Sequence, residues 1–380
     1  MSLLLAFAAL PDPRRGNAQR HNLLDMLVIA LTASICGAES CVDFADFGRD
    51  REALLREFLE LPGGLPSHDT YSRLFRLLDP AAFAGCFSAF LDGLGADGPG
   101  VVAIDGKTLR RSFDRAALRS PLHVVTASAA EARVVTAFAA EARVVIGQVA
   151  AGTKEGEIIA ARQLLGLLDL KDVLVTGDAL HCQGETARLI KEKGGDWLFT
   201  LKDNRPSQRA EVDAWFADPL NRPAGEHTTT DADHGRLEVR RHRVSHDIDW
   251  LLSDRRHPGE ASMPGLAMIG EVEAATTRDG RTTTIRRFYL GSARLDAAGF
   301  ARAVRAHWAI ENSLHWVLDV GFDEDRTRNR RDNGPENLAT LRKLTLNLLQ
   351  RTRTDISIRR KRKRSGWSDD FARTVIGQMR

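Results

Sequence analysis

Two short apolar runs that each end on an aspartate constrain the fold of this 380-residue chain more than any other feature. Residues 101–104 run directly into Asp105, and residues 173–176 reach Asp178 after one glycine. Short β-branched runs bounded by turn residues predict buried strands. Because α/β sheets carry their chemistry at the carboxyl ends of such strands, we expect an α/β fold with both aspartates at one edge of its sheet. For either aspartate alone, a carboxylate that only caps a turn is the alternative.

A third carboxylate, Glu311, lies beside the apolar stripe of a predicted helix. The stripe consists of residues at helical spacing, Ile310, Leu314 and Val317. His307 and His315 stand one turn before and one turn after Glu311. A carboxylate next to a buried stripe requires a cation or a proton partner. A surface glutamate paired with its two histidines is the alternative.

Asp105, Asp178 and Glu311 together form a hard, all-oxygen set of ligands. Such ligands suit Mg²⁺ or Mn²⁺ and leave coordination positions open for water and phosphate. Two such ions about 3.5 to 4 Å apart activate a water or hydroxyl and stabilise the leaving oxygen of a phosphoryl transfer. The three carboxylates are therefore candidate metal ligands and catalytic residues for phosphodiester chemistry.

A zinc site is a second interpretation of the Glu311 helix. His307, Glu311 and His315 are spaced four residues apart, so all three can lie on one helical face. This spacing lacks the general base and the third ligand of the HExxH pattern. The sequence therefore favours magnesium or manganese over zinc.

Positive charge is concentrated near the C-terminus. Residues 326–364 contain fourteen Lys and Arg against three Asp and Glu, a net charge of +11, so the remaining residues carry −8 of the total +3. A cationic end on an otherwise acidic chain indicates a polyanionic partner, most simply double-stranded DNA. A solvated, disordered tail is the alternative for residues 359–364. The cations expected to contact DNA phosphates are Lys107, Lys202, Arg326, Arg328, Arg330 and Arg331.

Composition excludes several classes of protein. A hydrophobic content of 43% supports a packed core and excludes a disordered chain. The four cysteines form no CxxC pair, which argues against a structural zinc site or a disulfide framework and fits a reducing cytoplasm. The apolar runs are too short to span a bilayer, and the first residues lack the basic segment of a signal peptide. We therefore expect a cytoplasmic protein with no membrane partner.

Five segments are expected along the chain. Apolar residues at helical spacing predict a helical N-terminal domain for residues 1–95, with Arg73 and Arg76 as candidates for DNA contacts and a solvated face as the alternative. The other segments are the first part of an α/β core (96–210), a β-rich insertion (211–292), the C-terminal part of the core with the Glu311 helix (293–350) and a basic tail (351–380).

A tandem repeat separates the first two aspartates. Residues 124–133 are followed at once by a second copy at 134–143, and only Ser128 against Phe138 differs. One additional central strand would reverse the direction of every later strand, so the sheet survives only if the extra copy bulges out or extends a hairpin beyond its neighbours. We predict an extended hairpin.

Three long motifs carry a resemblance to a known family. They are DGKTLRRS at 105–112, TGDALHCQ at 176–183 and HWAIENSLHWVLDVGFDEDR at 307–326. The chain resembles the DDE transposases of bacterial insertion sequences, in the group that includes the H-repeat-associated proteins. The resemblance covers most of the chain and extends to DPRR at 12–15, CGAES at 36–40 and LPSHDTYSRLF at 65–75, which are similar to that group's associated N-terminal domain.

The resemblance implies an RNase H-like catalytic core with a β-rich insertion, preceded by an all-α N-terminal domain. It implies that Asp105, Asp178 and Glu311 are a catalytic triad that binds Mg²⁺ (or Mn²⁺) and cleaves and joins DNA at transposon ends. Synapsis of two ends implies a homodimer on DNA, and a DNA substrate implies association with the cytoplasmic nucleoid.

Two departures from the family pattern bear on activity. The wider group carries a Tyr, an Arg and a Lys around its catalytic Glu, where this chain has Val304, His307 and Leu318. His307 or Arg305 is therefore the candidate for the missing phosphate contact. The tandem copy is the second departure, since the resemblance calls for a single such segment.

Two further functions stay open on the sequence alone. A DNA-binding remnant would keep the fold and the charge but lose turnover through the duplication. A stand-alone nuclease would share the metal chemistry without joining DNA ends. The presence of all three acids favours an active transposase.

Overall fold

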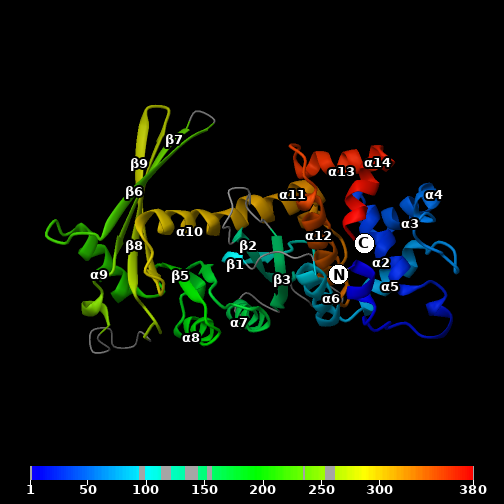
Figure 1. Ribbon diagram of the computed structural model, residues 1–380, viewed down its shortest axis with the longest axis horizontal. Coiled ribbons are helices and arrows are strands. Elements are labelled where there is room, and N and C mark those ends of the chain that lie inside the picture. Colours follow the sequence, from blue (N-terminus) through cyan, green and yellow to red (C-terminus); the bar gives the residue numbers. More distant parts are fainter. Residues whose placement is uncertain are drawn as a thin grey trace.

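The computed structural model describes residues 2–93, 99–112, 121–132, 144–151, 156–233, 236–252 and 262–379. The molecule is elongated (Figure 1). Helices from both ends of the chain gather at one end of it, and a continuous sheet runs from its middle to the other end. The structure is therefore of the mixed α/β class with a helical N-terminal region, as predicted.

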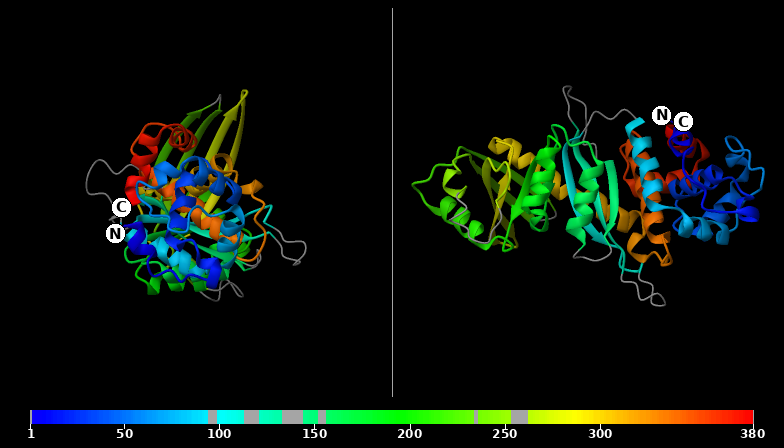
Figure 2. Two further views of the ribbon diagram at one scale, coloured as in Figure 1. Left: turned by 90° about the vertical axis from the view of Figure 1, so that its right-hand side faces the viewer. Right: turned by 90° about the horizontal axis from the view of Figure 1, so that it is seen from below.

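The regular elements in the described part of the N-terminal region are all helices. Its helices are α1 (Leu3–Phe7), α2 (Leu23–Ile35), α3 (Cys41–Asp50), α4 (Glu52–Leu55), α5 (His68–Leu77) and α6 (Pro80–Gly93). Ser40 and Asp43 form a capping box at the start of α3, and Ser67 caps α5. Helix α2 is almost entirely buried, because the C-terminal helices pack around it (Figure 2).

Nine strands form one sheet in the order β3-β2-β1-β4-β5-β9-β8-β7-β6. The first five are β1 (Pro99–Thr108), β2 (His123–Ala132), β3 (Val144–Ala151), β4 (Leu174–Gly177) and β5 (Asp196–Leu201). Strands β1, β4 and β5 are parallel, whereas β2 and β3 run antiparallel to their neighbours. The predicted runs at 101–104 and 173–176 thus lie side by side in the centre of the sheet.

Helices cover both faces of this sheet. Helices α7 (Glu157–Leu167), α8 (Gly184–Glu192) and α9 (Pro206–Ala217) share an apolar cluster with β1, β4 and β5 on one face. On the other face, Phe300 and Val304 of α10 (Ala297–Ala309) pack against β5 and the later strands. Gly270 permits this contact, because a Cβ atom there would lie 2.6 Å from the Phe300 ring.

The β-rich segment continues the same sheet. It contains β6 (Gly225–Asp233), β7 (Arg236–Ser245), β8 (Met268–Arg278) and β9 (Arg281–Gly291), all antiparallel, and β9 pairs with β5. The insertion is therefore an extension of the core sheet, and its long hairpins project beyond α10 (Figure 1).

The first copy of the tandem repeat forms most of β2. Ala129 of β2 pairs with Val144, the first residue of β3. The second copy, at 134–143, lies outside the described residues. Strand β3 keeps its antiparallel pairing with β2, so the sheet order is intact on both sides of the repeat. The extended hairpin remains a prediction.

Residues 351–380, expected as a basic tail, contain two packed helices, α13 (Ile358–Trp367) and α14 (Asp369–Ile376). Lys361 of α13 donates hydrogen bonds to two carbonyls at the end of α12 (Gly334–Arg351), at 2.9 and 2.6 Å. Arg362 donates to the carbonyls of Ser34 and Ala38, both at 3.0 Å, and to that of Gly321. These contacts join the C-terminal segment to the N-terminal region, so this part of the chain is not a disordered tail.

No single helix among the described residues has the length and apolar character needed to cross a membrane. Only the bent pair α5 and α6 reaches that length jointly.

Candidate active site

The two aspartates lie at one edge of the sheet. Ala103 of β1 pairs with Thr176 of β4, and Asp105 and Asp178 each come two residues beyond this pair. Asp178 also accepts a hydrogen bond from the Leu180 N–H at 2.8 Å and so caps the 3₁₀ turn Ala179–His181. Its side chain is nevertheless 44% exposed, so its second oxygen remains accessible beside Asp105. Asp178 can therefore cap this turn with one oxygen and take part in the candidate site with the other.

Glu311 reaches the same region from α10. This helix continues into a π-helical segment, Ile310–His315, before α11 (Trp316–Phe322) begins. Ile310 and Leu314 are each 3% exposed, which confirms the predicted buried stripe, whereas Glu311 is exposed. Both α10 and the π-helical segment contact β1. π-helical turns inside α-helices occur frequently at functional sites.

The three carboxylates interact electrostatically. Burial, together with the smaller effect of the negative charges of Asp178, Glu311 and Glu157, raises the pKa of Asp105 to about 7 against a hydrogen bond from the Gly106 N–H. A pKa this far above that of a free aspartate results mainly from removal of the carboxylate from water, and the neighbouring negative charges add to it. The charges of Asp178 and Glu311 thus act on Asp105, although the three residues are separated by up to 206 positions in sequence.

Two histidines flank the cluster without neutralising it. His315 Nδ1 lies 3.4 Å from Asp105 Oδ2, but burial lowers the pKa of His315 to about 3. Burial also lowers the pKa of His307 to about 4, although the charge of Asp178 opposes this shift. Both imidazoles are therefore neutral at pH 7. Because His315 faces Asp105, the arrangement lends no support to a zinc site on the Glu311 helix.

Glu157, a buried acid beside the strand end that carries Asp105, was not identified from the sequence. Glu157, at the start of α7, lies 2.7 Å from His123 Nε2 through one oxygen and 3.6 Å from His181 Nε2 through the other. Gly106 is required beside it, since a Cβ atom there would lie 2.5 Å from both Glu157 and His123. Glu157 is 5% exposed, and no periodicity distinguishes a buried glutamate of this kind from an ordinary first-turn acid.

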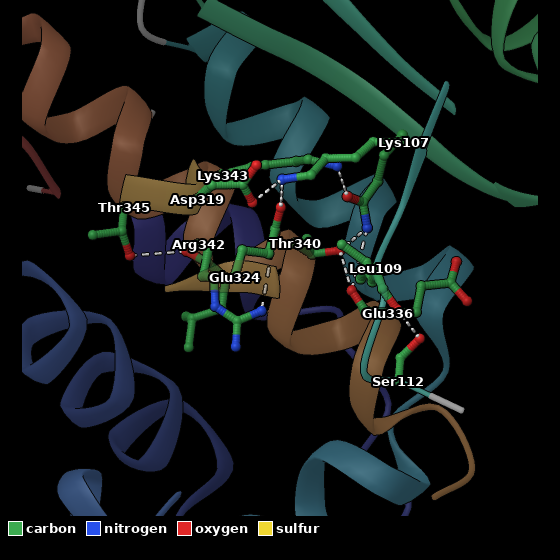
Figure 3. Close-up of polar contacts among 12 residues, drawn as sticks. Lys107, Leu109, Ser112, Asp319, Glu324, Glu336, Thr340, Arg342, Lys343 and Thr345 are labelled. Atoms are coloured by element: carbon green, nitrogen blue, oxygen red, sulfur yellow. Dashed lines mark hydrogen bonds and ion pairs between the residues drawn. The ribbon is translucent and has the colours of Figure 1, made fainter. Parts of the chain in front are cut away.

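Lys107 does not occupy the predicted place. Its side chain is only 11% exposed, and its ammonium lies 2.5 Å from Asp319 and 3.0 Å from Glu324. Figure 3 shows these groups gathered with Arg342 and Lys343 beside α12. An ammonium held by two carboxylates has no free charge for a phosphate, so the structure argues against the expected DNA contact of Lys107 and points to an internal ion pair.

The network around Lys107 is deeply buried. Burial raises the pKa of Glu324, but Lys107, Arg342 and Lys343 together bring it below its ordinary value. Burial lowers the pKa of Lys343 to about 8, and its ammonium donates to Thr126 at 2.9 Å and to Gln148 at 2.5 Å. The network therefore ties β1, β2 and β3 to the C-terminal helices.

The other expected phosphate contacts differ in their surroundings. Lys202 is exposed after β5, and its charge acts on His307. Arg305 is engaged by Asp231, with a nitrogen-to-oxygen distance of 2.6 Å.

In the segment after α11, Arg326, Arg328 and Arg331 are exposed, while Arg330 is half-buried and donates to the Arg111 carbonyl at 3.1 Å. In the N-terminal region, Arg76 pairs with Asp332 at 2.8 Å, and Arg73 is exposed.

The carboxylate set fits a divalent cation by its chemistry. Within the described ranges, no three His, Cys, Asp or Glu side chains already lie close enough together to hold a metal ion. Crowded carboxylates are, however, the ligands that hard divalent cations select, and a cation removes the repulsion that raises the pKa of Asp105. Asp105, Asp178 and Glu311 are the residues that would hold it.

The raised pKa of Asp105 predicts a pH-dependent stability difference. An unfolded aspartate ionises near pH 4 and the folded one near pH 7, so folding becomes less favourable as the pH rises through this window. In metal-free buffer, Asp105→Asn should therefore gain stability over the wild type between pH 4 and 7, by no more than about 4 kcal/mol. Urea denaturation at several pH values measures this difference. A difference that does not grow with pH would contradict the raised pKa of Asp105.

Comparison with known proteins gives a consistent result over the whole chain. Residues 96–348 match the family model described as "Transposase DDE domain", and residues 4–91 match "DDE_Tnp_1-associated". The chain is 32% identical over 379 residues to "H repeat-associated putative transposase YhhI" of Escherichia coli (strain K12), covering 98% of this chain and 97% of that protein. It is 34% identical over 397 residues to "Putative transposase YncI" of Escherichia coli O157:H7, covering 99% and 94%. A protein of Xanthobacter autotrophicus, "Uncharacterized protein in dhlA 3'region", is 37% identical over 290 residues, covering 75% and 92%.

Proposed function

Because the chain belongs to the Transposase DDE domain family, we propose that it is a metal-dependent DNA transposase that cuts and joins DNA at insertion-sequence ends. In this proposal Asp105, Asp178 and Glu311 are the catalytic triad. The observation that supports it is that the charges of Asp178 and Glu311 act on the buried Asp105, although the three residues come from β1, the end of β4 and the π-helical segment after α10. The strand order β3-β2-β1-β4-β5, with β2 antiparallel to the other four strands, supports an RNase H-like core.

The proposed cofactor is Mg²⁺ or Mn²⁺. Bound divalent ions would lower the pKa of an attacking water or 3′-hydroxyl and stabilise charge on the leaving oxygen. The chain itself supplies the carboxylate oxygens, and neutral His315 holds the orientation of Asp105 at 3.4 Å. The buried Glu157 cluster supports the strand ends from behind, where Gly106 leaves it room.

The departures from the family pattern have a structural counterpart. Val304 is 6% exposed and Leu318 is fully buried, so neither side chain reaches a phosphate. Arg305 is held by Asp231, and His307 is neutral at pH 7. Lys202 is exposed and near His307, so we assign the phosphate contact beside Asp178 to Lys202. Arg326, Arg328 and Arg331 would bind phosphates farther along the DNA.

The retained pairing of β2 with β3 favours an active enzyme over a remnant. The repeat lies between these strands, yet Asp105 and Asp178 keep matching positions in the sheet. Because two DNA ends must be joined in one complex, the proposed active form is at least a homodimer on DNA. Its substrate places it in the cytoplasm, at the nucleoid.

The proposal is tested with duplexes that carry the inverted ends of the insertion sequence, incubated with the purified chain and Mg²⁺. We expect strand cleavage followed by transfer to a target duplex, and loss of both steps with a chelator. Cleavage without joining would instead identify a nuclease, and binding without either step would identify a remnant.

A further inference from the structure

Helix α13 divides its cations between two faces. Lys361 and Arg362 are buried and bind carbonyls of neighbouring helices. Arg359, Arg360 and Lys363 are exposed, and none of them forms an ion pair or side-chain hydrogen bond with a residue that the structure describes. Residues three and four positions apart share a helical face, so these three cations form one exposed surface, here called the outer face of α13.

The packing of the helix fixes the direction of this face. Arg362 lies over the Phe322 ring at 4.2 Å and donates to the Gly321 carbonyl, both at the end of α11. Ser357 caps the first turn of α13. A rigid, capped helix holds its three ammonium and guanidinium groups in place, which a flexible basic tail does not do.

Helix α13 is connected to the segment that carries Glu311 through α11. Helix α11 directly continues the π-helical segment that carries Glu311, and α13 contacts α11 (Figure 1). The exposed segment with Arg326, Arg328 and Arg331 follows α11 in sequence. Cations at these two places would follow one DNA molecule away from the carboxylates.

We propose that the outer face of α13, formed by Arg359, Arg360 and Lys363, binds the phosphate backbone of double-stranded DNA outside the active site. The inference rests on the proposed function, because it takes DNA as the substrate. Charge complementarity identifies the partner: three unpaired cations on one rigid face match a regular polyanion and read no base sequence. Residues 359–379 lie beyond the region matched by either family model.

Removing residues 351–380 would not test this proposal, because Lys361 and Arg362 would be lost as well. The sharper variant is the full chain with Arg359→Gln, Arg360→Gln and Lys363→Gln. Its control carries Lys171→Gln, Arg188→Gln and Arg222→Gln, which are also exposed, remove the same charge and lie away from α13. Unfolding midpoints equal to that of the wild type establish that both variants are folded.

Binding to a random-sequence duplex is measured by fluorescence anisotropy from 50 to 300 mM salt. We expect the slope of log affinity against log salt to fall by about 3 in the α13 variant, with roughly 10²-fold weaker binding at 0.1 M salt. The control should keep the wild-type slope. A slope shared by the α13 variant and the control would overturn the proposal.

Two further readouts separate the possible failures. Vesicles with an anionic lipid serve as a competing polyanion. If the α13 variant loses vesicle binding while its duplex binding is unchanged, DNA is not the partner of this face. If the wild type cleaves ends but the α13 variant binds DNA normally, only this inference fails. If the wild type neither binds nor cleaves duplexes, the proposed function fails with it.

Discussion

Each of the substitutions Asp105→Asn, Asp178→Asn and Glu311→Gln is expected to abolish DNA cleavage while the chain still binds DNA. Each removes one anionic oxygen and leaves the size of the side chain unchanged. A metal ligand contributes several kcal/mol to the stabilisation of charge in the transition state, so its loss slows the reaction by roughly 10³-fold or more. Cleavage rates on end-containing duplexes with Mg²⁺ measure this loss, and anisotropy measures binding.

Asp169→Asn is the matched control for the triad variants. Asp169 is exposed at a turn, where its carboxylate accepts a hydrogen bond from the Lys171 N–H at 3.0 Å. Its replacement should leave the cleavage rate within about 2-fold of the wild type, because surface substitutions rarely exceed about 0.5 kcal/mol. Full activity in any one triad variant would remove that residue from the triad.

Lys107→Met is expected to destabilise the fold by about 3 to 5 kcal/mol, because it leaves Glu324 buried without its nearest cation. Glu324 is 2% exposed and lies 3.0 Å from the Lys107 ammonium. Urea denaturation measures the free energy of unfolding. Lys202→Met is the control, since Lys202 is exposed and its replacement should change stability by less than about 0.5 kcal/mol.

A second variant identifies the cause. Adding Glu324→Gln to Lys107→Met should recover part of the lost stability, since the uncompensated charge is removed. The two roles of Lys107 also differ in salt dependence. If Lys107→Met kept its stability and lowered the DNA-binding salt slope by about 1, Lys107 would be a phosphate contact and the internal ion pair would be secondary.

The sequence predicted the parts of the site that depend on local periodicity. Asp105 and Asp178 follow apolar strands, and parallel pairing of those strands brings their ends together. Ile310 and Leu314 marked the buried side of the helix and so left Glu311 on the accessible side. In each case the spacing of the apolar residues indicated on which side of its strand or helix the neighbouring carboxylate lies.

The parts that depend on distant partners were not predictable. Lys107 follows Asp105 closely and has the position of a phosphate contact, but its carboxylates come from residues 212 and 217 positions later. The six basic residues at 359–364 have no apolar pattern, so nothing local distinguishes the two that are buried from the four that are exposed. Glu157 is buried only because His123 and His181 approach it from other elements.

The packing of α2 against helices that are translated later sets an order for folding during synthesis. Its apolar side chains share one core with α12 and α14, which are translated more than 300 residues afterwards. While the ribosome is still making the sheet, α2 has α3 beside it but lacks the cover of α12 and α14, so part of its hydrophobic surface is open to chaperones. Arg362 also donates to the Gly321 carbonyl at the end of α11, so this contact beyond the Glu311 segment forms only once α13 has been made.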